Sequence, residues 1–346
     1  MSDVKSSAGS EFVSIIIAAY NCEAFIGAAI ESCLRQTHPK IEVVVVNDGS
    51  KDRTADVLRG FTDRVRVIDQ KNGGLANARN TGVRESRGEL ISWMDADDFV
   101  HPEKVATQVA AFRANPALVL VSSDFSAFRT EAEGDYESSH IRSYYDAYRR
   151  LGGHQAIYPQ HTPLAGAVAA REVLSGEVDE KLLWGNFVHP PTVMARRAAM
   201  ERAGVFDERL RYSSDYDLIL RLARVGPFGF IDAPLLRYRR SNQQMSGATR
   251  YGHMQLETVR ILDKVASARP DASPALTRLI KRRKSESLVS AASTLGPKAR
   301  LRAFGLLLDG WRLGVPFKQS AVALARITLP TPVQRFVARI ARGHSV

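Results

Sequence analysis

Three aspartates stand at the end of a predicted buried strand, in the stretch Asp95-Ala96-Asp97-Asp98. The preceding run, residues 90–94, is short and apolar, which is typical of a strand buried on both faces. Neighbouring carboxylates repel one another unless a cation neutralises them, and hard cations such as Mg²⁺ and Mn²⁺ take oxygen ligands. Magnesium is commonly held by one or two carboxylates together with substrate phosphates. The stretch therefore indicates either an acidic surface turn or a site for a metal-bound diphosphate.

Short apolar strands alternate with helical segments, and this order predicts an α/β fold with a mostly parallel sheet and flanking helices. The expected strands are 13–18, 41–46, 65–68, 90–94 and 117–122, and the expected helices are 25–34, 54–59, 75–87 and 102–115. Beyond a looser tyrosine-rich segment, the pattern predicts helices at 196–204 and 216–225, a strand at 229–232 and an edge element at 235–239. From residue 251 onward the pattern is helical.

Polar residues follow several of these strands. Asn21, Asp48 and Asn72 each come just after a predicted strand, as do the carboxylates of residues 95–98. Ligands of such sheets bind outside the carboxyl ends of the strands. We therefore expect these residues to gather on one edge, which favours the ligand site over the surface turn.

Composition is ordinary for a soluble globular protein, with 45% hydrophobic and 25% charged residues in 346. No apolar run approaches the roughly 18 residues of a membrane-spanning helix. Residues 1–11 lack the apolar core of a signal peptide. Cys22 and Cys33 have no metal-ligand spacing, so we expect buried free thiols in a reducing cytoplasm.

The positive charge is concentrated in the last part of the chain. Residues 251–346 hold 17 Lys and Arg against 5 Asp and Glu, a net charge of +12, whereas residues 1–250 have a net charge of −1. The run 281–284 could be a solvated helix face or could bind an anionic membrane. Residues 333–340 are predicted to form a short basic amphipathic helix, which favours the membrane, and no motif supports nucleic-acid binding.

From about residue 13 to residue 246 the chain resembles the family 2 glycosyltransferases, which have the GT-A fold. Each matching piece is loose alone, and their order and spacing together are specific. The pieces are VSIIIAAYN (13–21), VVNDGSKD (45–52), NGGLANARNTG (72–82), MDADD (94–98), GVFD (204–207), SDYDL (214–218) and YR (238–239).

The resemblance implies an inverting transfer of a sugar from a nucleotide-sugar donor, usually a UDP-sugar. By position in the family's motifs, Ala19 and Tyr20 would shape the nucleotide pocket and Asp48 would contact the base. Asp95 matches the residue that contacts the ribose. Arg79 would lie on a helix that faces the phosphates.

The resemblance also assigns the metal and the catalytic base. Asp97 matches the residue that holds a divalent cation, Mn²⁺ or Mg²⁺, on the diphosphate, and Asp215 matches the general base. The family usually has Glu before that base, where this chain has Ser214. It often has His two residues after the closing Arg, where this chain has Ser241, so Asn242 or water would supply a third metal ligand.

The chemistry agrees with these roles. A bound cation stabilises the charge of a leaving nucleoside diphosphate, while a carboxylate on the opposite side of the sugar takes the proton of the attacking hydroxyl. A single displacement inverts the anomeric carbon, as in inverting glycoside hydrolysis. Asp98 is left open between capping the next helix and a direct role, and His189 is interpreted as a satisfied loop histidine.

These features predict a disordered tail over residues 1–12, a GT-A catalytic domain over 13–250 and a basic helical extension over 251–346. The expected partners are a nucleotide-sugar donor, a glycan or lipid-linked acceptor, and an anionic membrane surface; nucleic acid is not expected. The expected location is the cytoplasm, peripherally on the inner face of the membrane. Two alternatives stay open: a sugar nucleotidyltransferase, and a non-catalytic nucleotide-sugar-binding or scaffold protein.

Overall fold

The computed structural model describes residues 11–130, 134–166, 168–240, 248–295, 300–314 and 323–324. The chain divides into two compact units, residues 1–241 and 242–346. Several expectations lie outside the described residues: the tail at 1–10, the positions Ser241 and Asn242, and the basic helix at 333–340. The proposed domain bounds stay predictions.

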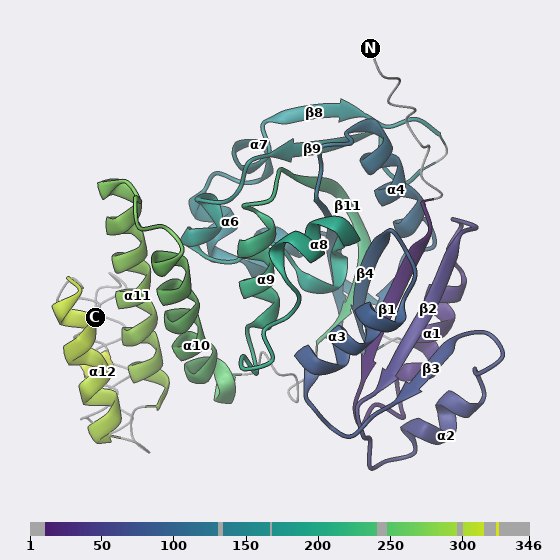
Figure 1. Ribbon diagram of the computed structural model, residues 1–346, viewed down its shortest axis with the longest axis horizontal. Coiled ribbons are helices and arrows are strands. Elements are labelled where there is room, and N and C mark those ends of the chain that lie inside the picture. Colours follow the sequence, from purple (N-terminus) through teal and green to yellow (C-terminus); the bar gives the residue numbers. More distant parts are fainter. Residues whose placement is uncertain are drawn as a thin grey trace. The chain divides into compact units, whose positions relative to one another are not determined.

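The first unit is built on one mixed sheet with the strand order β3-β2-β1-β4-β10-β6-β11-β9-β8 (Figure 1). The first four strands of this order are parallel, and β6 is parallel to β11. The short β5 pairs with β11, and β7 pairs with β6. The strands are β1 (Val13–Ala19), β2 (Ile41–Asn47), β3 (Arg66–Asp69), β4 (Leu90–Asp95), β5 (Phe99–Val100), β6 (Leu120–Phe128), β7 (Asp135–Glu137), β8 (Gln160–Pro163), β9 (Glu172–Gly176), β10 (Met194–Arg196) and β11 (Phe228–Arg239).

The helices alternate with these strands as the sequence predicts. Those of the first unit are α1 (Ile26–Leu34), α2 (Thr54–Arg59), α3 (Leu75–Glu85), α4 (Lys104–Ala114), α5 (Ile141–Tyr144), α6 (Asp146–Arg150), α7 (His154–Ile157), α8 (Arg197–Ala203) and α9 (Ser214–Leu222), with 3₁₀ turns η2 (Lys181–Trp184) and η3 (Pro190–Thr192). The expected α/β class with a mostly parallel central sheet is confirmed.

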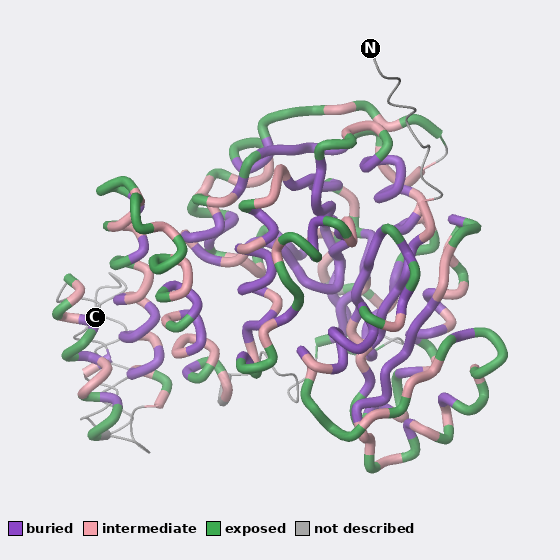
Figure 2. Tube along the Cα trace, viewed as in Figure 1, coloured by how far each residue is buried: buried purple, intermediate pink, exposed green. Residues whose placement is uncertain are grey.

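The middle strands are buried along nearly their whole length (Figure 2). Every residue of β1 from 13 to 17 is buried, which explains why that strand is a continuous apolar run instead of an alternating one. Helix α3 packs against β1 and β2, and the approach is close at Gly82. A Cβ at Gly82 would lie 2.3 Å from Cγ2 of Ile16, so only glycine allows α3 to approach this near.

Three expectations about the elements are wrong in detail. The expected strand 117–122 begins later and runs to Phe128, and the two elements expected at 229–239 are one bent strand, β11. The antiparallel strand β10, inserted between β4 and β6, has no counterpart in the prediction. Three residues are too few for a two-residue alternation to be recognised, and tertiary pairing alone creates this strand.

The second unit contains three described helices, α10 (Ala248–Ser267), α11 (Pro274–Leu295) and α12 (Arg300–Arg312). Helix α11 packs against both α10 and α12. Small side chains allow the close approach of α11 and α12, since Ala292 and Ala303 are fully buried at their contact. No helix among the described residues is long and apolar enough to cross a membrane. The break between α10 and α11 falls at Pro270 and Pro274.

Candidate active site

The loop after β1 carries the two residues predicted to shape the nucleotide pocket. Ala19 is buried at the end of the strand, whereas Tyr20 beside it is 47% exposed. Asn21 has a positive φ of 48°, a conformation that asparagine tolerates better than most residues. Its Oδ1 accepts the N–H of Lys51 at 2.8 Å, and its own N–H donates to Ser50 Oγ. The loops after β1 and β2 are therefore joined, with Tyr20 presented at their edge.

Asp48, predicted to contact the base, is buried and holds the loop before α3. Its Oδ1 accepts the N–H of Gly73 and the side-chain N–H of Gln70, and its Oδ2 accepts the N–H of Gly74, all at 2.7–2.8 Å. The side chain of Asn72 donates to the Asp48 carbonyl. The Asp48 carboxylate thus fixes the loop that starts α3, and the contact with a base stays a prediction.

Helix α3 is fastened to a distant loop by its asparagines. The side chain of Asn80 accepts the N–H of Phe206 at 3.0 Å and donates to the Phe206 carbonyl and to Glu208. Asn77 also donates to Glu208 at 2.9 Å. The GVFD piece and the NGGLANARNTG piece are therefore bound to each other, which gives their joint presence in the sequence a physical reason.

Arg79 pairs with one of the predicted site carboxylates and acts electrostatically on another. Its Nη2 donates to Asp95 at 2.7 Å, and its guanidinium lies over the Phe206 ring, 5.5 Å from the centroid. Its Nε and Nη1 are buried without a hydrogen-bond partner among the described residues. Burial raises the pKa of Asp215, while the charge of Arg79 lowers it and that of Asp95 raises it. One cation is thus shared by Asp95 at the end of β4 and Asp215 in the first turn of α9.

The acidic turn after β4 is anchored by the last residue of β11. Asp98 is fully buried, and its Oδ1 accepts the backbone N–H of Arg239 at 2.9 Å. The Nε of Arg239 donates to the carbonyl of Asp97. Asp98 does not cap α4, whose N-cap is Glu103. The closing YR motif therefore stabilises the turn that presents Asp97, whose own side chain is half-buried.

The donor set of this turn fits a cation held mainly by a nucleotide. Burial raises the pKa of Asp98 well above its ordinary value, and the charges of Asp97 and Asp95 raise it further. This concentration of negative charge is what a divalent cation would relieve. The described residues contain no group of three or more His, Cys, Asp or Glu placed to hold a metal by themselves. One or two carboxylates suffice where phosphates and water complete the coordination.

An aromatic cluster around Tyr145 lies within electrostatic range of Asp95 and Asp215, and no role was predicted for it from the sequence. The Tyr145 hydroxyl lies 3.0 Å from Nδ1 of His189, whose ring stacks on Phe125 at a centroid distance of 3.9 Å. Burial lowers the pKa of His189 to about 3, so the imidazole is neutral. The pKa of Tyr145 is raised, chiefly by burial and then by Tyr144, with Asp215 among the contributing charges. His189 is a structural histidine, and it holds Tyr145 toward the site.

The structure thus brings Arg79, Asp95 and Asp215 into one electrostatic group, with Asp97 in the same turn as Asp95. Asp48 lies in the neighbouring loop, bonded to the start of α3. The cluster joins Phe125 of β6, Tyr145 just after α5 and His189 just before η3, so no local spacing could have revealed it. Its only signal in the sequence was the excess of tyrosines in the looser segment.

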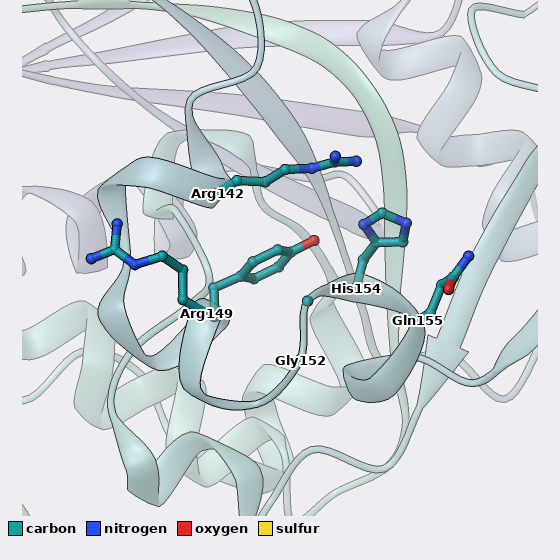
Figure 3. Close-up of a pocket in the computed structure, with 7 residues that line it drawn as sticks. Arg142, Arg149, Gly152, His154 and Gln155 are labelled. Atoms are coloured by element: carbon teal, nitrogen blue, oxygen red, sulfur yellow. The ribbon is translucent and has the colours of Figure 1, made fainter.

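A pocket of about 430 Å³ lies outside this group, lined by residues of the three short helices α5 to α7 and their connections. Figure 3 shows Arg142, Arg149 and His154 around it. Arg142 and His154 both lie near Asp232, at 3.4 and 3.6 Å. None of the predicted site residues lines this pocket. Cys22 and Cys33 are free and buried, as expected.

Comparison with known sequences gives the family. The profile of "Glycosyl transferase family 2" matches residues 14–167. An uncharacterised glycosyltransferase of Rickettsia typhi is 29% identical over 238 residues, which cover 68% of this chain and 66% of the relative. A chondroitin synthase of Escherichia coli is 33% identical over 223 residues, covering 64% of this chain and 28% of the relative. The matches therefore span from about a quarter to just under two thirds of these relatives' lengths.

Comparison with solved structures shows that this chain shares its fold with known transferase structures. The Staphylococcus aureus protein TarS 1–349, in complex with UDP-GlcNAc, has a TM-score of 0.57 at 17% identity, covering 90% of each chain. The mannosyltransferase PcManGT of Pyrobaculum calidifontis, in complex with GDP-Man and Mn²⁺, has a TM-score of 0.54 at 19% identity, covering 96% of this chain and 86% of the neighbour. Residues 14–167 of this chain thus match glycosyl transferase family 2, and the chain has the GT-A fold of the solved neighbours.

Proposed function

We propose that this chain is an inverting glycosyltransferase that moves a sugar from a UDP-sugar donor to a hydroxyl group. The acceptor is a glycan or a lipid-linked molecule, and the product belongs to a surface polysaccharide or glycoconjugate. The observation that carries the proposal is the grouping of Asp95, Arg79 and Asp215 beside the acidic turn that presents Asp97. The UDP-GlcNAc complex of TarS and the name of the chondroitin synthase relative support a UDP-sugar donor.

In this proposal Asp215 accepts the proton of the attacking hydroxyl. Its burial raises its pKa, which makes the carboxylate a stronger base than an exposed aspartate. Arg79 keeps Asp95 in place by a charge-assisted hydrogen bond and limits the rise in the pKa of Asp215. Asp95 is then positioned to accept hydroxyl donors of a ribose, as a half-exposed carboxylate at the end of β4.

Asp97 would hold a divalent cation together with the donor diphosphate. The cation, when bound, supplies positive charge for the leaving nucleoside diphosphate. The protein's own contribution is to hold the turn rigid, through the Arg239 contacts with Asp97 and Asp98. The Mn²⁺ in the PcManGT complex supports Mn²⁺ as the first ion to try.

A donor panel tests the proposal. Purified protein is incubated with Mn²⁺ and each of several UDP-sugars, and release of UDP and of pyrophosphate is measured separately. We expect UDP release from one sugar class, and at least about tenfold less from Asp97→Asn, because a single carboxylate carries the protein's contact to the cation. If wild type and Asp97→Asn released UDP equally poorly from every donor, the chain would be a non-catalytic nucleotide-sugar-binding protein. Release of pyrophosphate would indicate a nucleotidyltransferase.

A further inference from the structure

Helix α12 of the second unit has two apolar faces. Its inner face packs on α11, where Ala303 and Leu307 are fully buried against Val289 and Ala292. Its outer face carries Leu301, Phe304 and Leu308, which are 93%, 44% and 37% exposed. The spacing of these three residues places them along one stripe of the helix. The inner face already holds the helix in the unit, so the outer stripe is not needed for its packing.

The outer stripe is unusual for the described part of the chain. Exposed large hydrophobic residues elsewhere are scattered singly, as is normal for a protein surface: Tyr20, Phe25, Val205 and Tyr251. In contrast, Leu301, Phe304 and Leu308 fall within eight positions of α12. The half-buried Trp311 continues the stripe one turn beyond Leu308. A clustered apolar stripe on an otherwise polar surface marks an interaction site.

Charge indicates which partner this stripe fits. Residues 251–346 have a net charge of +12. Part of the basic run 281–284 is neutralised within the unit, since Arg282 and Arg283 pair with Glu286 and Lys284 pairs with Asp263. Arg302, next to Leu301 on α12, is exposed and has no ion pair among the described residues. An apolar helix face with an unpaired arginine beside it, in a unit of high positive charge, is typical of a helix lying in the headgroup region of an anionic membrane.

We propose that the outer stripe of α12, formed by Leu301, Phe304 and Leu308, docks this chain on an anionic lipid surface. The apolar side chains enter the boundary between headgroups and acyl chains, while Arg302 and the excess charge of the unit contact anionic headgroups. A second copy of this chain would carry the same positive charge, so the charge opposes a dimer through this face. The docking surface is independent of the proposed sugar transfer.

Vesicle sedimentation of the full chain tests the proposal. Vesicles of phosphatidylcholine mixed with phosphatidylglycerol are compared with vesicles of phosphatidylcholine alone. We expect wild-type protein to sediment with the anionic vesicles and to be released by salt, because charge attraction is screened. The triple variant Leu301→Gln, Phe304→Gln, Leu308→Gln should bind at least about tenfold more weakly, since three apolar side chains no longer enter the bilayer. Glutamine keeps the helix propensity high.

Tyr251→Gln is the matched control, an exposed apolar residue on α10 of the same unit, and it should bind as wild type. Circular dichroism and light scattering of both variants report folding and oligomeric state. Unchanged sedimentation of a folded triple variant would overturn the proposal. The proposal would also be overturned if the wild-type protein were a dimer that does not bind vesicles while the triple variant were a monomer. The stripe would then be a contact between two copies of the chain. Donor hydrolysis, carried by the first unit, should not change.

Discussion

The donor side and the aromatic side of the candidate site are built differently. On the donor side, short loops are bonded to each other by backbone and side-chain groups, as where Asp48 holds Gly73 and Gly74. On the aromatic side, Tyr145 is placed by a ring stack and one hydrogen bond to His189, from segments far apart in the chain. The donor loops are therefore fixed by a network of hydrogen bonds, whereas the aromatic side depends on packing between distant segments. In the proposed function, the aromatic side would contact the acceptor.

Asp215 stands where the two sides meet, and replacing it has the largest expected effect. Asp215→Asn should lower kcat by about 10²–10⁴-fold, the usual contribution of a general base, with donor affinity little changed. In wild-type protein, kcat should fall as pH drops through the raised pKa of Asp215, because the protonated carboxyl cannot accept a proton. UDP release and calorimetric donor binding measure the two quantities.

The matched control for that change is Asp146→Asn, at a carboxylate of α6 that is 72% exposed and forms an ion pair with Arg149. It should leave kcat and its pH profile unchanged. A kcat for Asp215→Asn within a few-fold of wild type would show that Asp215 is not the general base. The donor side and the aromatic side would then not be linked through this residue.

Asp48→Asn probes the rigidity of the donor loops. The amide would turn a donor toward the N–H groups of Gly73 or Gly74, leaving buried groups unsatisfied. We expect the free energy of unfolding to fall by about 1–3 kcal/mol. Donor affinity should fall with it, while acceptor KM stays constant. Urea denaturation and donor titration measure both, with the exposed Asp56→Asn as the control. Full stability in the Asp48 variant would show that the loop does not depend on this carboxylate.

Gly82→Ala probes the same side through packing. The added methyl would meet Ile16 in the core, and such overpacking costs about 1–3 kcal/mol. A shift of α3 also moves Arg79, so donor KM should rise together with the loss of stability. Gly305→Ala on α12, where a Cβ meets no atom within 4 Å, should be neutral or stabilising in thermal denaturation. Equal behaviour of the two variants would contradict the close approach of α3.

Tyr145→Phe has the smallest expected effect and addresses the aromatic side alone. Loss of the hydroxyl leaves Nδ1 of His189 without its partner, at a cost of about 0.5–1.5 kcal/mol in stability. Acceptor KM should rise while donor KM does not. Tyr144→Phe is the control, since the Tyr144 hydroxyl makes no hydrogen bond with the described residues. A rise in donor KM for Tyr145→Phe would place this residue on the donor side and break the comparison.

Much of the donor side could be predicted from the sequence. The strands β1, β2 and β4 are buried on both faces, so their apolar runs are continuous and their ends can be located within a residue or so. The polar residues that follow them must then meet at one edge of the sheet. The inserted strand β10 and the bend of β11 escaped prediction, because pairing with distant strands and not local pattern creates them.

The sequence by itself determined the fold class, the family and the set of residues at the edge of the sheet, because all of these follow from local patterns in a fixed order. Only the tertiary structure decided how those residues share their charges. In the structure, Asp48 accepts hydrogen bonds from the loop before α3, and Arg79 pairs with Asp95. Tyr145, held by His189, interacts electrostatically with Asp215. Burial and charges within a few ångströms shift a pKa. Neither the burial of a residue nor its distance from other charges can be predicted from the spacing of a sequence motif.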